Sequence, residues 1–338
     1  MIREAIQQLV GGQGLDADTA AEAMDDIMRG EATPAQMGAF LVALRMKGET
    51  ADELVGLVRS MRRHATTIAA PEGAIDTCGT GGDSSGTFNI STAAALVARG
   101  AGAVVAKHGN RAATSRCGSA DVFEALGYPL NLAPPQVQEC VARAGIAFLF
   151  APTFHPAMRH AGATRSEIGV RTAFNLLGPM ANPALVRRQA LGVGNAAAAA
   201  RMAEVLAALG HERALVFHGS DGLDELTTTG ESHIYDLRDG EVREYDIDPA
   251  KLGLSRVTVA ELQGGDAATN AAIVRGVLAG EAGPARDIVL LNAAAALIVA
   301  GLAADFHQGL GVAAESVDSG KAREALANLV DVACDLAA

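Results

Sequence analysis

The feature that most constrains the fold is a change of pattern near Ile68, where amphipathic helix patterns give way to short apolar runs. Before this point Asp16, Thr33 and Thr50 each stand as a helix N-cap in front of an amphipathic run, which predicts four short helices. Beyond it, the β-like runs AIDT, AVVAK, AFLFA, ALVFH and DIVLL alternate with helical segments. This alternation is typical of an α/β fold with a mostly parallel central sheet. The 338 residues therefore predict a small helical N-terminal domain, 1–68, packed on a larger α/β domain, 69–338.

Three further segments carry structural expectations. Residues 155–177 have a helical pattern, so we expect helices within about 165–185 to complete the helical domain. Residues 231–248 predict a hairpin with RDGE at its turn. The uncharged stretch between Asp287 and Asp305 predicts a buried strand followed by a buried helix rather than a membrane span.

Charge and composition exclude several classes of function. Lys and Arg number 27 against 39 Asp and Glu, so the net charge is −12, which opposes generic binding to nucleic acid or to anionic membranes. Aromatic residues make up 4% and Trp is absent, which leaves few platforms for base stacking. The 4 cysteines form no CxxC pair and the N-terminus MIREAIQQLV is not followed by an apolar segment. We therefore expect reduced thiols, no secretory signal and a cytoplasmic protein.

A glycine-rich segment after the first predicted strand is the most informative motif. The run CGTGGDSSGTFNIST places Gly79, Gly81 and Gly82 before a helix that opens near Asn89. Glycines let backbone N–H groups approach a ligand, and a helix N-terminus favours anions, so the segment predicts a phosphate cradle. It fits neither a Walker loop, since no lysine follows Lys47 before residue 107, nor GxGxxG. A glycine-rich connector with no ligand is the alternative.

The next predicted strand runs into a second polar loop, KHGNRAATSRCGSAD, at residues 107–121. Two of its cations, Lys107 and Arg111, can balance phosphate charge. Four further side chains offer directional hydrogen bonds: Asn110, Thr114, Ser115 and Ser119. Because ligands bind at the carboxyl ends of strands in open α/β sheets, the two loops predict one phosphate site. A capped, solvated loop is the alternative.

A third polar cluster, HGSDGLDELTTTGES, contains Asp221, Asp224 and Glu225. Carboxylates here predict binding of Mg²⁺, with Asp224 and Glu225 serving two ions that ligand phosphates also hold. A solvated acidic turn is an equally simple interpretation of this cluster.

A helical stretch farther along contains Arg159, Arg165 and Arg171 beside His155 and His160, and should stop at the Gly-Pro pair of residues 178–179. An arginine that reaches the cleft can bind a substrate carboxylate. The residues alone do not choose among the three arginines, and a solvated helix face explains any one of them.

The segments DTCGTGGDSSGTFNIST, KHGNRAATSRCGSAD and RSEIGVRTAFNLLGPMANP together resemble the anthranilate phosphoribosyltransferase family over essentially the whole chain. The resemblance implies a nucleoside-phosphorylase-like fold, a homodimer formed through the helical domains, and Mg²⁺, two ions, as cofactor. It implies transfer of the phosphoribosyl group from phosphoribosyl diphosphate to anthranilate in tryptophan biosynthesis. One departure is Thr114, where the family's loop usually has Ser.

Carried over by position, the resemblance implies three sets of site residues. Ser91, Asp224 and Glu225 would ligate Mg²⁺, and Gly79, Asn110 and Arg165 would hold anthranilate, with Arg165 at its carboxylate. Phosphoribosyl diphosphate would be held by Gly79, Gly82, Asp83, Thr87, Asn89, Ile90, Ser91, Thr92, Lys107, His108, Gly109, Asn110, Arg111, Ala112, Ala113, Thr114, Ser115 and Ser119.

Two other functions compete with this one. A pyrimidine-nucleoside-phosphorylase-type transferase should lack both the GTGGD–NIST arrangement and the RTAFNLLGP stretch, and would need no paired metal carboxylates. A catalytically silent binding paralogue, such as one that binds nucleic acid, predicts a basic surface or loss of Asp224 and Glu225. Neither expectation matches this chain, so a transferase remains the main prediction.

Overall fold

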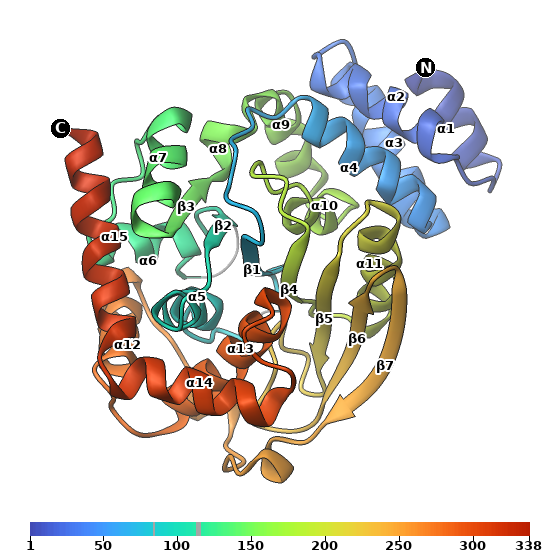
Figure 1. Ribbon diagram of the computed structural model, residues 1–338. Coiled ribbons are helices and arrows are strands. Elements are labelled where there is room, and N and C mark those ends of the chain that lie inside the picture. The colour runs from blue at the N-terminus through green and yellow to red at the C-terminus, as the bar shows by residue number, and fades with distance from the viewer. Residues whose placement is uncertain (84, 113–115) are drawn as a thin grey trace.

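The N-terminal helices begin at the predicted caps. Asp16 accepts a backbone hydrogen bond at the start of its helix, and Thr33 and Thr50 form capping boxes with Gln36 and Glu53. The apolar faces of these helices share one buried cluster. The computed structural model describes residues 1–83, 85–112 and 116–338. Its first four helices (Figure 1) are α1 (Ile2–Val10), α2 (Ala17–Met28), α3 (Pro34–Lys47) and α4 (Ala51–Arg63).

A seven-stranded sheet forms the centre of the rest of the chain, in the order β3-β2-β1-β4-β5-β6-β7. The strands from β3 to β5 are parallel, and β6 and β7 are antiparallel additions at one edge. The expected mostly parallel sheet is therefore confirmed. The strands are β1 (Ile75–Gly79), β2 (Val105–Gly109), β3 (Ile146–Phe150), β4 (Arg188–Gly192), β5 (Arg213–Gly219), β6 (Ser232–Arg238) and β7 (Glu241–Ile247).

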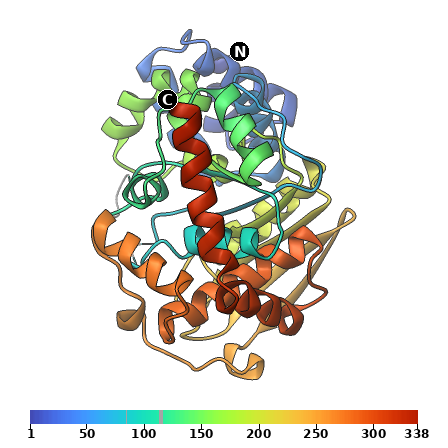
Figure 2. The same ribbon diagram turned by 60° about the vertical axis from the view of Figure 1, so that its left-hand side comes forward.

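Helices cover both faces of the sheet (Figures 1 and 2). On one face α13 packs against α5, β1, β4 and β5, and on the other α11 packs against β5, β6 and α4. Figure 2 shows α15 along the outside, where it packs on α5 and α7. The helices of this part are α5 (Ile90–Gly100), α6 (Ser119–Leu126), α7 (Pro134–Ala144), α8 (Ala151–Phe154), α9 (Arg159–Ile168), α10 (Phe174–Met180), α11 (Ala196–Ala208), α12 (Ala267–Leu278), α13 (Pro284–Ala300), α14 (Phe306–Asp318) and α15 (Lys321–Ala337). The short 3-10 turns are η1 (Pro156–Met158), η2 (Pro249–Leu252) and η3 (Val259–Leu262).

The second helical segment lies against the N-terminal helices although it is distant in sequence. Helix α9 packs on α2 and α3, and α10 packs on α4. Both segments contribute to one buried cluster, which includes Leu54, Phe174 and Leu177. The chain thus leaves the sheet after β3 to contact the helical bundle and returns to the sheet as β4.

The structure corrects one predicted strand, adds a strand that was not predicted, and confirms the predicted hairpin. The run DIVLL is not a strand: it lies in the first half of α13, which continues to Ala300. This helix is buried nearly all round, so its sequence has no periodicity that separates it from a buried strand. Strand β4 was not predicted, because RQALG begins with two polar residues. The hairpin is confirmed, with positive φ at Asp239 and Gly240 as a type I′ turn requires.

The predicted helix stop is displaced slightly, because Pro179 lies inside the last turn of α10, which ends at Met180. No helix in the described part of the chain combines the length and apolarity needed to cross a membrane.

Candidate active site

The glycine loop, residues 79–83, begins at the last residue of β1, at the carboxyl edge of the sheet. Gly81 and Gly82 have φ of 69° and 70°, a conformation that favours glycine. Gly79 is glycine for another reason: a Cβ there would lie 2.8 Å from Asp224 Cγ and still closer to its Oδ2. The loop therefore places its backbone directly against the acidic segment that follows β5.

Three carboxylates converge beside this loop. Asp224 Oδ2 accepts a hydrogen bond from Gly81 N at 2.6 Å, and Glu225 Oε1 accepts one from Ser91 N at 3.2 Å, in the first turn of α5. Burial raises the pKa of both carboxyls; the charge of Asp83 raises that of Asp224 further, and the charge of Asp224 raises that of Glu225. Mutual repulsion of this kind is what a hard cation relieves.

The donor set fits Mg²⁺ held partly by a ligand. Within the described residues, no three or more His, Cys, Asp or Glu side chains are arranged to hold a metal ion unaided. Mg²⁺ is commonly bound by one or two carboxylates together with substrate phosphates. Ser91, Asp224 and Glu225, the predicted ligands, lie together and fit that mode.

Lys107 lies beneath the glycine loop, not in the open cleft. Its side chain is 1% exposed, and Nζ donates to the Thr77 carbonyl and, at 3.3 Å, to Ser91 Oγ. Its charge faces Glu225 and also Asp76, a fully buried residue of β1. Lys107 therefore orders the start of α5 while it supplies positive charge under the site.

Asp76 and Asn182 were missed by the sequence reasoning. Asp76 accepts hydrogen bonds from His108 N at 3.2 Å and from Asn182 Nδ2 at 2.8 Å, and Asn182 also donates to the Ala106 carbonyl. Burial raises the pKa of Asp76 to about 6, and Lys107 opposes that shift. The available signal was a carboxylate inside the predicted strand AIDT.

Three other predicted residues of this region have buried or bridging positions. Thr92 Oγ1 is buried and has no hydrogen-bond partner among the described residues. Thr87 pairs with Gln263 in an isolated bridge, and its Oγ1 lies 3.2 Å from Ser85 Oγ. Asn89 precedes α5, but its amide bonds Cys117 O and Asn270 rather than capping the helix.

The loop after β2 is ordered by α6. Arg111 is paired with Asp121 and Glu124, at 2.7 and 2.9 Å, so in this structure it balances carboxylates. Asp121 also accepts hydrogen bonds from the Ala112 and Gly118 N–H groups, and Ser119 Oγ donates to Asn110 O at 3.4 Å. The predicted residues Ala113, Thr114 and Ser115 lie outside the described residues.

A second feature, the histidine cavity, opens between this loop and the helical segment, with a volume of about 520 Å³. All three residues assigned to anthranilate, Gly79, Asn110 and Arg165, line it. Its walls also include Met61, Cys78, His108, His155, Arg159, Phe174 and Pro179. Cationic side chains among mostly apolar walls suit an aromatic acid.

Arg165 and the two histidines give this cavity its chemistry. The Arg165 guanidinium lies 5.0 Å from the centre of the Phe174 ring and has no ion-pair partner in the described part of the chain. The rings of His108 and His155 are 5.1 Å apart, and burial lowers their pKa values to about 3 and about 4. Both imidazoles are therefore neutral at pH 7, and each Nε2 lacks a partner within the described residues.

The structure separates the three arginines that the sequence left open. Arg165 and Arg159 line the histidine cavity, whereas Arg171 donates to the Gly82 and Gly81 carbonyls at 2.6 and 3.1 Å. Arg171, between α9 and α10, thus binds the glycine loop through its backbone carbonyls.

Comparisons with known proteins agree with this architecture. The model of the glycosyl transferase family, helical bundle domain, matches residues 3–65, and that of the glycosyl transferase family, a/b domain, matches residues 71–323. Anthranilate phosphoribosyltransferase of Rubrobacter xylanophilus is 53% identical over 338 residues, which is 100% of this chain and 99% of that protein. The crystal structure of anthranilate phosphoribosyltransferase from Thermus thermophilus is 42% identical, with a TM-score of 0.93 over 98% of this chain and 99% of the other. The enzyme from Saccharomyces cerevisiae in complex with PRPP and Mg is 26% identical, with a TM-score of 0.92 over 99% and 98%.

A helical bundle joined to an α/β domain, with a glycine loop and an acidic group at one sheet edge, defines a two-domain glycosyltransferase. Within that class the chain belongs to the anthranilate phosphoribosyltransferase family, enzymes of tryptophan biosynthesis. The expected family, fold and enzyme class are confirmed.

Proposed function

We propose that this chain transfers the 5-phosphoribosyl group from phosphoribosyl diphosphate to the amine of anthranilate and releases diphosphate. The observation that carries the proposal is the position of Gly79. This residue lines the histidine cavity and also packs against Asp224, so a cavity suited to an aromatic acid meets the acidic, glycine-rich site at one point.

The phosphoribosyl diphosphate would lie along the glycine loop and the first turn of α5. The backbone of Gly82 is available to a phosphate, and the Thr92 hydroxyl beneath the first turn of α5 has no hydrogen-bond partner among the described residues. The complex of the yeast relative with PRPP and Mg supports this ligand class. The residues we assign are those predicted from the sequence, residues 113–115 included.

Ser91, Asp224 and Glu225 would hold Mg²⁺, and two ions are part of this proposal. When bound, Mg²⁺ supplies positive charge that stabilises the negative charge developing on the diphosphate. Asp83 lies close enough to Asp224 to raise its pKa, so it belongs to the same acidic group.

The acceptor would be held by its carboxylate on Arg165, which is free of an ion pair among the described residues. The anthranilate amine is neutral at pH 7 and attacks C1 of the ribose without prior loss of a proton. The C1–N bond forms as the C1–O bond to diphosphate breaks, and the amine proton passes to the neighbouring carboxylate of the substrate. No covalent nucleophile from the protein is needed, so orientation by Arg165 is the main contribution of the cavity.

Three further proposals accompany this function. We divide the chain into residues 1–68, completed by α9 and α10, and residues 69–338, a division supported by the packing of α9 on α2 and α3. A homodimer through the helical domain and a cytoplasmic location remain predictions. Retention of Asp224 and Glu225 favours the transferase over a silent paralogue.

Arg165→Ala tests the assignment, with Arg159→Ala as the matched control from the same helix and cavity. Arg165→Ala should raise the KM for anthranilate about tenfold or more, because a charge-assisted pair is lost, and leave the KM for phosphoribosyl diphosphate near its original value. Arg159→Ala should change both little. Equal losses for both substrates, or a larger effect of Arg159→Ala on anthranilate, would contradict the role of Arg165.

A further inference from the structure

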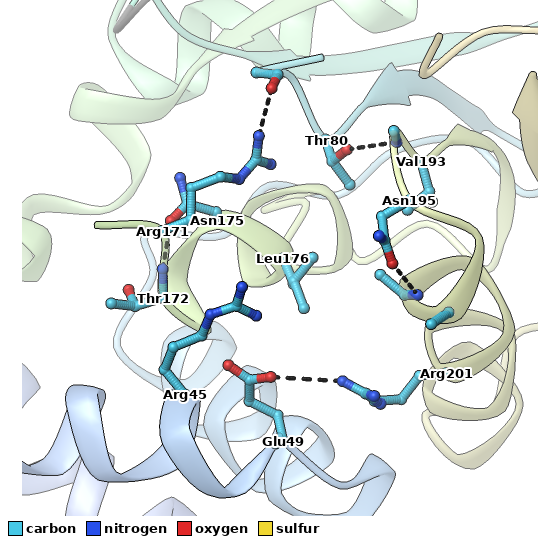
Figure 3. A pocket seen from close by; sticks show the side chains of 15 residues that line it. Arg45, Glu49, Thr80, Arg171, Thr172, Asn175, Leu176, Val193, Asn195 and Arg201 are labelled. Carbon is cyan, nitrogen blue, oxygen red and sulfur yellow. Dashed lines mark hydrogen bonds and ion pairs between the residues drawn. The ribbon is translucent and has the colours of Figure 1, made fainter. Parts of the chain in front are cut away.

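A third feature, the arginine cavity, lies on the helical side of the glycine loop and has a volume of about 420 Å³ (Figure 3). Its lining includes Arg45 of α3, Glu49 between α3 and α4, Arg171, Thr80 of the glycine loop, and Asn195 and Arg201 of the α11 segment. None of Arg45, Glu49 and Arg201 lines the histidine cavity. The arginine cavity therefore extends beyond the proposed anthranilate site, and the two cavities share only Thr80 and Asn175 among their described lining residues.

The charge in this cavity is not balanced by the protein. Its described lining residues include three arginines and a single carboxylate, that of Glu49. Glu49 is 4% exposed and its Oε2 lies 3.5 Å from Arg201 Nη1, while Arg45 has no ion-pair partner within the described residues. Arg45 and Arg201 approach from α3 and α11 (Figure 3). In a chain with a net charge of −12, a local excess of cations at a concave site favours an anionic ligand.

The position in the sheet also favours a ligand. Thr80 follows β1 and Asn195 follows β4, and these adjacent strands lead into α5 and α11, which cover opposite faces of the sheet. The crevice between such strands is a topological switch point, where open α/β sheets bind ligands. Helix α11 begins at this crevice, so its first turn adds partial positive charge.

Arg171 connects the cavity to the glycine loop. It lines the cavity while its guanidinium donates to the carbonyls of Gly81 and Gly82. A Cβ on Gly82 would lie 3.1 Å from Arg171 Cζ and closer to its Nη1, so the contact is tight. An anion in the cavity competes with these carbonyls for Arg171.

We propose that the arginine cavity is a second anion-binding site, for a compact phosphate-bearing ligand, held by Arg45, Arg171 and Arg201. Its volume accommodates an inorganic diphosphate or a small phosphorylated sugar. Occupancy pulls Arg171 away from the loop carbonyls and so alters the glycine loop from behind. The two proposed sites meet at the glycine loop, because Gly82 lines this cavity and is also assigned to phosphoribosyl diphosphate.

Isothermal titration calorimetry of the full chain in EDTA tests the site. Inorganic diphosphate and ribose 5-phosphate serve as separate probes, one for each of the two proposed ligand types. Arg45→Gln/Arg201→Gln should weaken binding of at least one probe about tenfold or more, since charge-assisted hydrogen bonds are lost. Arg201→Gln keeps a donor for Glu49, and Arg45→Gln alone removes no ion pair among the described residues, so at least the single variant should fold and show part of the loss. Arg187→Gln, which lies outside the cavity and pairs with Glu212, is the control and should bind as the original chain does.

Tungstate, a phosphate analogue, locates the site directly. An anomalous peak between Arg45 and Arg201 in crystals of the full chain supports the proposal. Unchanged affinity for both probes in the variants, or tungstate found only at the start of α5, overturns it.

Discussion

Substituting Gly79 by Ala should separate the catalytic geometry from the stability of the fold. Gly79 does not have a positive φ, so alanine is compatible with its backbone conformation. Its Cβ, however, would lie 2.8 Å from Asp224 Cγ, against the 3.4 Å or more of ordinary contacts, so Asp224 must retreat by about 0.6 Å or more. The charge-assisted hydrogen bond from Gly81 N to Asp224, worth about 1.5–3 kcal/mol, is then weakened.

Displacing a metal carboxylate by this amount should lower kcat/KM about 10²-fold, because catalysis depends on positioning at this scale. The assay is the loss of anthranilate fluorescence with phosphoribosyl diphosphate and Mg²⁺, beside a thermal unfolding curve. Gly194→Ala is the matched control: its Cβ meets Asp83 Cβ at an ordinary 3.4 Å, so activity should change less than about threefold. Full activity in Gly79→Ala, or an equal loss in Gly194→Ala, would refute the reasoning.

Three other predictions follow from buried polar groups. Asn182→Ala should lower the free energy of unfolding in urea by about 3 kcal/mol, because the buried Asp76 carboxylate loses a donor; a loss below about 1 kcal/mol would argue against that role. Burial lowers the pKa of His211 from 6.5 to about 3, so the stability contributed by its neutral form is complete above pH 6.5 and declines as pH falls toward 3. His211→Gln should therefore remove about 1.4 kcal/mol per pH unit from the slope of unfolding free energy against pH, measured near pH 5; an unchanged slope contradicts it. Asp224→Asn/Glu225→Gln should abolish Mg²⁺-dependent turnover but not lower Tm, because carboxylate repulsion is relieved; undiminished turnover would exclude the metal assignment.

Much of the fold was predictable because its signals are local. Thr33 and Thr50 cap their helices through residues three positions away, and the hairpin turn depends on adjacent residues, Asp239 and Gly240. The first half of α13 was wrongly predicted as a strand. The helix is buried nearly all round, so its apolar residues show no helical periodicity.

The site was predictable only where its residues share one segment. The glycine loop and the acidic segment were found as motifs, but their contact through Gly79 and Asp224 joins residues far apart in the chain. The bond between Asp76 and Asn182 spans 106 positions, and Arg171 reaches back 89 positions to Gly82. Such pairings depend on the order of strands in the sheet, which no single segment determines.

The most direct test of the central claim is product formation by the purified chain. Anthranilate, phosphoribosyl diphosphate and Mg²⁺ are mixed with the protein, and anthranilate fluorescence and released diphosphate are followed together, with a matched sample in EDTA. The proposed function predicts loss of fluorescence and release of diphosphate in a one-to-one ratio, only when both substrates and free Mg²⁺ are present. No reaction from folded protein, together with phosphorolysis of a pyrimidine nucleoside by the same preparation, would contradict it.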